Sequence, residues 1–103
     1  MPSQPANDGG NANEIKVKTA YNGEVMITYI DENITFEQLC REIRGICRFS
    51  PDQDFTMKWV DEENDPCTLS TQMELAEAIR LYEVNRDSEL VIHAVIDFYL
   101  GIA

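Results

Sequence analysis

The dipeptide Asn22-Gly23 lies between two segments in which apolar residues recur at strand spacing, and this arrangement predicts a β-hairpin. Asn-Gly favours the type I′ turn, whose twist matches the twist of the strands it joins. The preceding segment EIKVKTAY (14–21) alternates between apolar and polar residues, and its core-facing members are Ile15, Val17 and Thr19. The following segment EVMITYI (24–30) is apolar and β-branched enough for a second strand. The fold must therefore be built onto this hairpin.

Two later segments have the spacing of amphipathic helices. In the first, apolar residues fall on one stripe, namely Phe36, Leu39, Cys40, Ile43 and Cys47. Thr35 and Gln38 form a capping box at its start. In the second, Thr71 and Glu74 predict another capping box, followed by Leu75, Ala78, Ile79 and Tyr82 at helical spacing.

The remaining patterned segments predict strands at 55–60 and 89–95, with a short strand at 67–69. The order is then strand, strand, helix, strand, strand, helix, strand, with no internal repeat. We expect an α+β fold of the ubiquitin-like β-grasp type, in which a mixed sheet of four to five strands carries two helices on one face.

The chain has 103 residues, which is enough for one small domain with a modest core. We expect a disordered leader at 1–13, rich in Pro, Asn and Gly, a folded domain at 14–95, and a short apolar tail of unknown role at 96–103. The start lacks the features of a signal peptide, and no apolar run is long enough to cross a bilayer, so we expect a cytoplasmic protein.

The charge is strongly negative, with nineteen acidic residues against eight basic ones and a formal net charge of −11. Such a field repels nucleic acid and anionic lipid, and we expect neither as a partner. The cysteines Cys40, Cys47 and Cys67 have no metal-binding spacing, and we expect free, buried or half-buried thiols. The lone histidine, His93, has no nucleophile in an interpretable motif beside it, so we expect no catalysis, no cofactor and no metal.

Four carboxylates fall within five positions of the segment WVDEENDP (59–66). The simplest interpretation is a solvated surface loop, as for most charge runs. A calcium loop is a second interpretation, because Asp61, Glu63 and Asp65 stand at alternate positions. It is disfavoured because Pro66 takes the place of the turn glycine and Gln72 the place of the final bidentate glutamate.

A third interpretation is a receptor for a protein cation. If the loop is extended, alternation places Asp61, Glu63 and Asp65 on one side, where they could surround a lysine or arginine. Glu74 could complete the cluster from the second helix, although its capping role competes for the same carboxylate.

This pattern, taken as Trp59, Asp61, Glu63, Asp65, Pro66 and Glu74, resembles the acidic motif called OPCA of the Phox-and-Bem (PB1) domain. The PB1 domain is a ubiquitin-like module for heterodimerisation, and the resemblance extends from about Ile15 to His93. Within the family, the stretches IKVKTAYNGEVMIT, FTMKWVDEENDPCT and EAIRLYEVNRDSELVIH are most similar to the amino-terminal domain of atypical protein kinase C.

The resemblance implies an acidic front, formed by Asp61, Glu62, Glu63, Asp65 and Glu74, that grips a basic cluster on a partner PB1 domain. It also implies a basic back at Lys18, with Lys16 and Arg41 as its supporting cations. Asn22 departs from the family, because we expect a basic residue at that turn position. With both faces, head-to-tail self-association is possible.

The partners that the resemblance implies are the Par-6 polarity scaffold and a sequestosome-type adaptor, which would recruit the domain to signalling complexes at the cell cortex. The chain is too short to hold a kinase catalytic domain as well. The alternative is a generic ubiquitin-like structural or modifier domain whose acidic loop is only solvated, although the final GIA is unlike the diglycine of a conjugated modifier.

Overall fold

The computed structural model describes residues 14–96, and these form five strands and two helices. Their bounds are β1 Glu14–Tyr21, β2 Glu24–Asp31, α1 Phe36–Cys47, β3 Phe55–Val60, β4 Pro66–Thr68, α2 Gln72–Val84 and β5 Leu90–Ile96. The short fourth strand begins one residue before the predicted one, and the fifth is displaced by one residue, since Ile96 still pairs with Phe55. The predicted leader at 1–13 and the tail from 97 onward lie outside the described residues.

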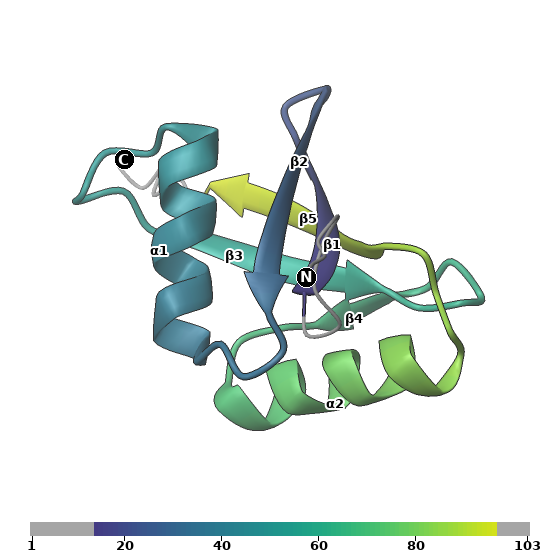
Figure 1. The fold of residues 1–103 in the computed structure, drawn as a ribbon. Coiled ribbons are helices and arrows are strands. Elements are labelled where there is room, and N and C mark those ends of the chain that lie inside the picture. Colours follow the sequence, from purple (N-terminus) through teal and green to yellow (C-terminus); the bar gives the residue numbers. More distant parts are fainter. Residues whose placement is uncertain (1–13, 97–103) are drawn as a thin grey trace, which may run out of the picture.

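The strands form one mixed sheet in the order β2-β1-β5-β3-β4 (Figure 1). β1 and β5 are parallel, whereas the other neighbours are antiparallel. The expected α+β, ubiquitin-like mixed sheet with two helices is confirmed, and the sheet has five strands. β2 and β4 are its two edges.

The β1–β2 hairpin has the predicted turn. Asn22 and Gly23 have φ angles of 54° and 82°, the left-handed conformation that a type I′ turn requires at both positions. The strands then pair residue by residue from Tyr21 and Glu24 to Glu14 and Asp31. This local signal sets the register of the whole hairpin.

The helices begin close together. Thr35 caps α1 in the predicted capping box with Gln38. The backbone N–H of Phe36, the first residue of α1, donates to Oε1 of Gln72 in the first turn of α2, at 2.7 Å. Figure 1 shows the two helices diverging from this point, with α1 beside β2 and α2 running past β4.

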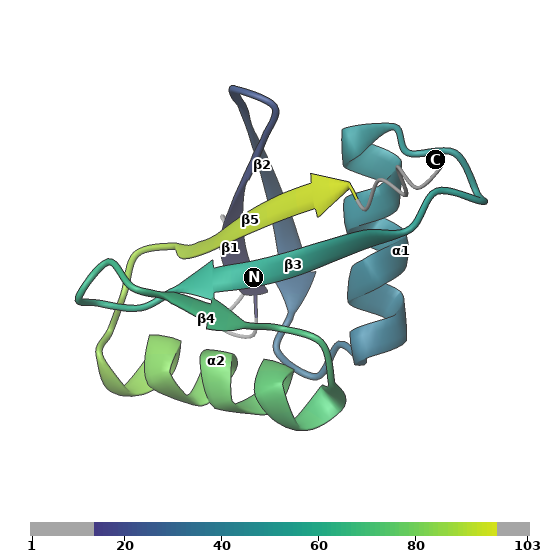
Figure 2. The same ribbon diagram turned by 180° about the vertical axis from the view of Figure 1, so that it is seen from behind.

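One core joins the sheet to both helices. Alternate residues of β1, β3 and β5 are buried, and they pack with one stripe of each helix, which comprises Leu39, Ile43, Cys47, Leu75, Ala78 and Ile79. The view from behind shows the opposite side of the sheet without a covering helix (Figure 2). Lys16, Lys18 and His93 lie on that open face, since they alternate with buried residues.

In residues 14–96, no helix combines the length and apolar character needed to span a membrane. Cys47 is buried, and Cys40 and Cys67 are half-buried free thiols.

Candidate functional site

The acidic segment connects β3 to β4 as a closed turn. The N–H of Asp61 donates to the carbonyl of Asp65 at 3.0 Å, and the N–H of Asn64 donates to the carbonyl of Asp61 at 2.9 Å. Asn64 has a φ of 66°, a left-handed conformation that asparagine tolerates better than most residues. The expectation of an extended loop is therefore wrong, because two antiparallel strands must be joined across a short distance.

The carboxylate of Asp61 organises this turn. Its Oδ1 accepts the backbone N–H groups of Glu63, at 2.9 Å, and Asp65, at 2.8 Å. Its Oδ2 lies 3.7 Å from Sγ of Cys67. Asp61 is half-buried, whereas Glu62, Glu63 and Asp65 are exposed. The turn thus holds three exposed carboxylates around one carboxylate that is already bonded.

No ion pair joins the carboxylates of the turn to a cation among residues 14–96. The ion pairs there join Glu89 to Lys16 and Lys18, and Glu77 to Arg80. The backbone of the turn is ordered by the bonds to Asp61, and the exposed carboxylates that it carries have no ion pair in this part of the chain. In the same residues, no three His, Cys, Asp or Glu side chains are grouped so that they could hold a metal ion.

Glu74 lies across a shallow depression from the turn. The depression is lined by Trp59, Asp61, Cys67, Thr68, Glu74, Glu77 and Leu81. Glu74 and Asp61 therefore line the same depression, although Glu74 belongs to α2 and Asp61 follows β3.

The carboxylate of Glu74 is bound to the start of α2. Its Oε1 accepts the N–H of Ser70, at 2.7 Å, and the hydroxyl of Ser70, at 2.9 Å. The hydroxyl of Thr71 accepts the N–H of Glu74 at 3.1 Å. The predicted capping box is therefore only half formed. Thr71 accepts the N–H of Glu74, but the Glu74 carboxylate accepts from Ser70, one residue before the N-cap, and not from the N–H of Thr71. These bonds, chiefly that from the Ser70 N–H, lower the pKa of Glu74.

Two further residues at this surface were missed by sequence reasoning. Glu77 adds a carboxylate, but Arg80 pairs with it at 2.9 Å, and this hydrogen bond lowers the pKa of Glu77. Their spacing of three residues on a helix was the available signal. Cys67 contacts the turn, and burial together with the charge of Asp61 raises the pKa of its thiol, which disfavours a reactive thiolate.

The predicted basic residues occupy two sides of the molecule. Lys18 and Lys16 project from the open face of the sheet, where Glu89 lies 3.5 Å and 3.9 Å from their ammonium groups. Arg41 projects from α1 on the helix side, so the three cations do not form one cluster. Glu89 was not foreseen, because its proximity depends on the parallel pairing of β1 and β5.

Comparison with known proteins gives a consistent result. A family model described as the PB1 domain matches residues 14–95. The chain is 61% identical over 106 residues to atypical protein kinase C of Drosophila melanogaster, and 44% identical over 95 residues to protein kinase C zeta type of Oryctolagus cuniculus. Each match covers 90% of the chain, which spans only 18% and 16% of the two kinases.

Solved structures share the fold at low sequence identity. An AtNBR1 PB1 filament structure has a TM-score of 0.72 at 20% identity, covering 84% of this chain and 100% of the other. The PB1 domain of Cdc24p has a TM-score of 0.69 at 18% identity, covering 82% and 98%. A ubiquitin-like domain from tubulin-binding cofactor B has a TM-score of 0.59 at 14% identity, covering 82% and 90%.

Proposed function

The chain belongs to the PB1 domain family, and from this premise we propose that its acidic front binds a lysine and arginine cluster on a partner PB1 domain. The observation that carries the proposal is the turn after β3, which presents Glu62, Glu63 and Asp65 to solvent with no cation bound to them in residues 14–96. A partner ammonium or guanidinium would form charge-assisted hydrogen bonds there and relieve the repulsion among the carboxylates.

The residues of the acidic front have different roles in this proposal. Asp61 fixes the turn through its two backbone hydrogen bonds and offers Oδ2 to the partner. Glu63 and Asp65 supply exposed charge at the tip, with Glu62 beside them. Glu74 is held by Ser70, so it faces the partner as a fixed carboxylate. A turn ordered before binding loses little conformational entropy when the complex forms.

The basic back is the weaker half of the proposal. Lys18, supported by Lys16, is available only if a partner carboxylate competes with Glu89. Arg41 could contribute only from the helix side. With both faces in use, the domain could add to further PB1 domains head to tail, as in the filament that the AtNBR1 structure records for that protein.

We infer that the partners are PB1 domains with a basic face, and the candidates are those of the Par-6 polarity scaffold and of a sequestosome-type adaptor. The function is then scaffolding in cytoplasmic signalling and cell polarity, as for the PB1 region of atypical protein kinase C. No chemical step is assigned to the domain.

Calorimetric titration with the PB1 domain of Par-6 tests the acidic front. We expect Asp65→Ala to weaken binding by about thirtyfold or more, because truncating one partner of a desolvated charge pair costs about 2 kcal/mol or more. Added salt should weaken the native complex as well. The matched control is Asp52→Ala, which removes an exposed carboxylate from the loop between α1 and β3. Equal losses for the two variants would mean that only net charge matters, and the proposed receptor would be rejected.

A further inference from the structure

The two edges of the sheet differ in how well they are protected against pairing with another strand. β4 has three residues and includes Pro66, which removes a backbone donor. β2 has eight residues, contains no proline, and pairs with β1 in an unbroken register. A long, regular edge of this kind is a template for an additional strand.

The free edge of β2 has identifiable hydrogen-bonding groups. In a two-residue hairpin, the residues that flank the turn exchange hydrogen bonds, and the pattern then alternates along the strands. Here Tyr21 and Glu24 flank the turn, so the N–H and C=O groups of Val25, Ile27 and Tyr29 point away from β1. The carbonyl of Asp31, which follows in this series, already accepts the N–H of Ile34 at 3.0 Å.

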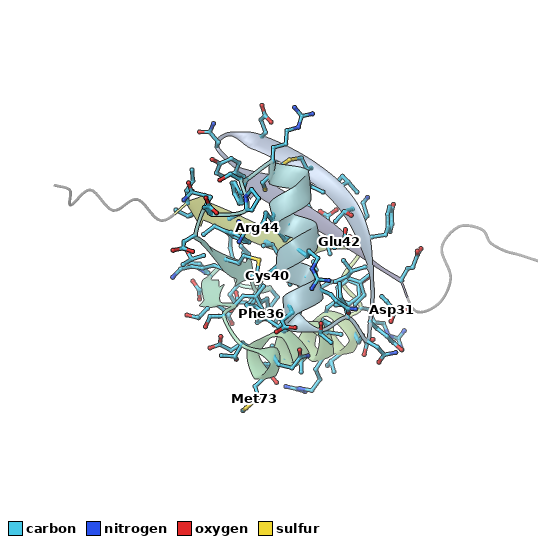
Figure 3. All side chains as sticks on the ribbon, turned by 90° about the vertical axis from the view of Figure 1, so that its left-hand side faces the viewer. Asp31, Phe36, Cys40, Glu42, Arg44 and Met73 are labelled. Carbon is cyan, nitrogen blue, oxygen red and sulfur yellow. The ribbon has the colours of Figure 1, made fainter. Side chains whose placement is uncertain are left out.

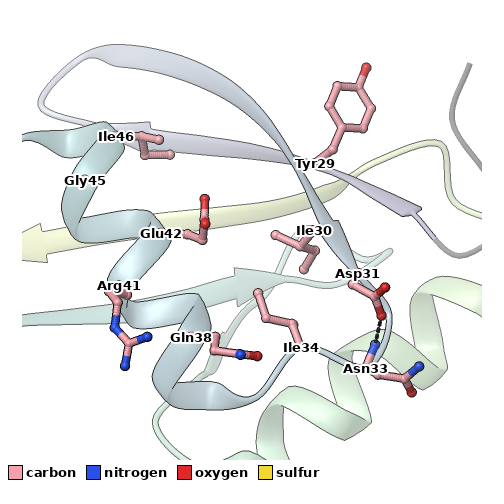
Figure 4. A pocket seen from close by; sticks show the side chains of 10 residues that line it. All are labelled: Tyr29, Ile30, Asp31, Asn33, Ile34, Gln38, Arg41, Glu42, Gly45 and Ile46. Carbon is pink, nitrogen blue, oxygen red and sulfur yellow. Dashed lines mark hydrogen bonds between the residues drawn. The ribbon is translucent and has the colours of Figure 1, made fainter.

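A groove runs beside this edge, between β2 and α1. Ile30, Ile34 and Ile46 contribute its apolar lining, and Glu42 contributes a carboxylate. Figure 3 shows Glu42 on the β2 side of α1, and Figure 4 shows it directed into the space between the two elements. Arg41 also lines the groove, and its guanidinium points away from β2 in the close view.

Gly45 of α1 adds no side chain to the groove, and there is free space in front of it. A Cβ added at this position would meet no atom within 4 Å, and Gly45 lies in the groove lining. An alanine would fit here, whereas a much larger side chain would extend into the groove.

An added strand would find suitable neighbours on both of its faces. On the open face of the sheet it would extend the row of Val25, Ile27 and Tyr29, whose exposed fractions are 54%, 48% and 55%. On the other face, a lysine stem could lie along Ile34 and Ile46 while its ammonium reaches Glu42 or Asp31. Alternation of side chains in a strand permits both arrangements at once.

We propose that the β2–α1 groove binds an extended segment of a partner protein, with apolar residues at alternate positions and lysine or arginine between them, as a sixth strand of the sheet. The charge selects a basic segment, since the chain carries −11, β2 begins at Glu24 and ends at Asp31, and Glu42 is directed into the groove. The same charge opposes pairing with a second copy. The main-chain hydrogen bonds would supply affinity, and the alternating side chains would supply specificity.

The test is heteronuclear NMR of the isotope-labelled chain titrated with the acetylated and amidated peptide Lys-Val-Lys-Ile-Lys-Val-Lys. We expect shifts at the amides of Val25, Ile27 and Tyr29 and along the Glu42–Ile46 turn of α1, with slower hydrogen exchange at the three strand amides. A peptide of the same composition, Lys-Lys-Lys-Lys-Val-Ile-Val, controls for attraction to negative charge alone.

Two variants act on the groove by independent routes. Gly45→Trp should fill it, whereas Gly45→Ala leaves it open. Ile27→Pro removes an outward N–H that β1 does not use, whereas Ile27→Val keeps it. We expect Gly45→Trp and Ile27→Pro each to weaken peptide binding by about tenfold, the effect of one or two lost hydrogen bonds and their contacts. A spectrum of each free variant establishes that it is folded.

The outcomes that would overturn the proposal are distinct. Shifts confined to residues 61–65 would assign the binding to the acidic front. Equal shifts with both peptides would show that negative charge alone attracts them and that no strand is added. Unchanged affinity in Gly45→Trp and Ile27→Pro would place the peptide elsewhere. A dimer of the native chain that Ile27→Pro abolishes would identify β2 as a homodimer edge. Asp65→Ala, which tests the acidic front, should leave strand shifts at β2 intact.

Discussion

At the residue scale, Thr19 gives a direct test of the core. Its side chain is 0% exposed, and its hydroxyl has no hydrogen-bond partner among the described residues. Burying an unsatisfied hydroxyl costs about 1 to 3 kcal/mol, so Thr19→Val should raise the free energy of unfolding by about 1 kcal/mol. Urea denaturation measures this change. The control is Thr56→Val, because Thr56 is an exposed residue of β3. Its free energy of unfolding should stay within about 0.5 kcal/mol of the native value. A destabilised Thr19→Val would show that the hydroxyl finds a partner in solution.

Some contacts of individual residues could be predicted from the sequence, and others could not. The clustering of Asp61 and Glu74 was predictable from the motif, but the role of Asp61 as acceptor for two backbone N–H groups depends on the left-handed Asn64. Glu89 lies beside Lys18 only because two strands distant in sequence are parallel neighbours. Such contacts are set by tertiary structure, and no local pattern encodes them.

At the scale of elements, the start of α2 should respond to acid. Hydrogen bonds from Ser70 lower the pKa of Glu74 from its ordinary value of 4.5. A carboxyl with a lowered pKa adds stability that is fully present above the unfolded pKa and is lost as the pH falls through the folded one. The native chain should therefore lose more unfolding free energy than Glu74→Gln between about pH 5 and pH 3.

Denaturant unfolding at several pH values measures this difference between native chain and variant. Glu63→Gln is the control, because it changes an exposed carboxyl of the turn and leaves the Ser70 bonds intact. If Glu74→Gln showed the same pH dependence as the native chain, the capping bonds would contribute nothing to folding.

Elements whose signals are local were predictable almost to the residue. The Asn22-Gly23 turn and the Thr35 capping box each depend on side chains within a few positions of one another. The acidic turn was not predictable in the same way, because charge alternation indicates an extended segment, whereas β3 and β4 require a reversal. The antiparallel pairing of β3 with β4 therefore determined the conformation of this segment, and the charge pattern did not.

At the scale of the whole molecule, the charges are distributed so that the two proposed PB1 surfaces are unequal. The acidic front lies at the end of β3, whereas Lys16 and Lys18 lie on the open face near the start of β5. Glu89 neutralises part of that positive charge. A head-to-tail contact between copies needs both surfaces, so the weaker one limits assembly.

We therefore predict that Glu89→Gln makes the chain self-associate at low salt, because it releases two lysines for the acidic front of another copy. Sedimentation velocity should show a weight-average mass that rises with concentration in Glu89→Gln and changes less in the native chain. Adding Asp65→Ala to the same chain, or raising the salt, should restore the monomer, because both remove the attraction between front and back. Glu83→Gln, which neutralises an exposed carboxylate at the end of α2, is the control for reduced net charge. Assembly that persists with Asp65→Ala present would proceed through another surface, of which the β2 edge is the first to examine.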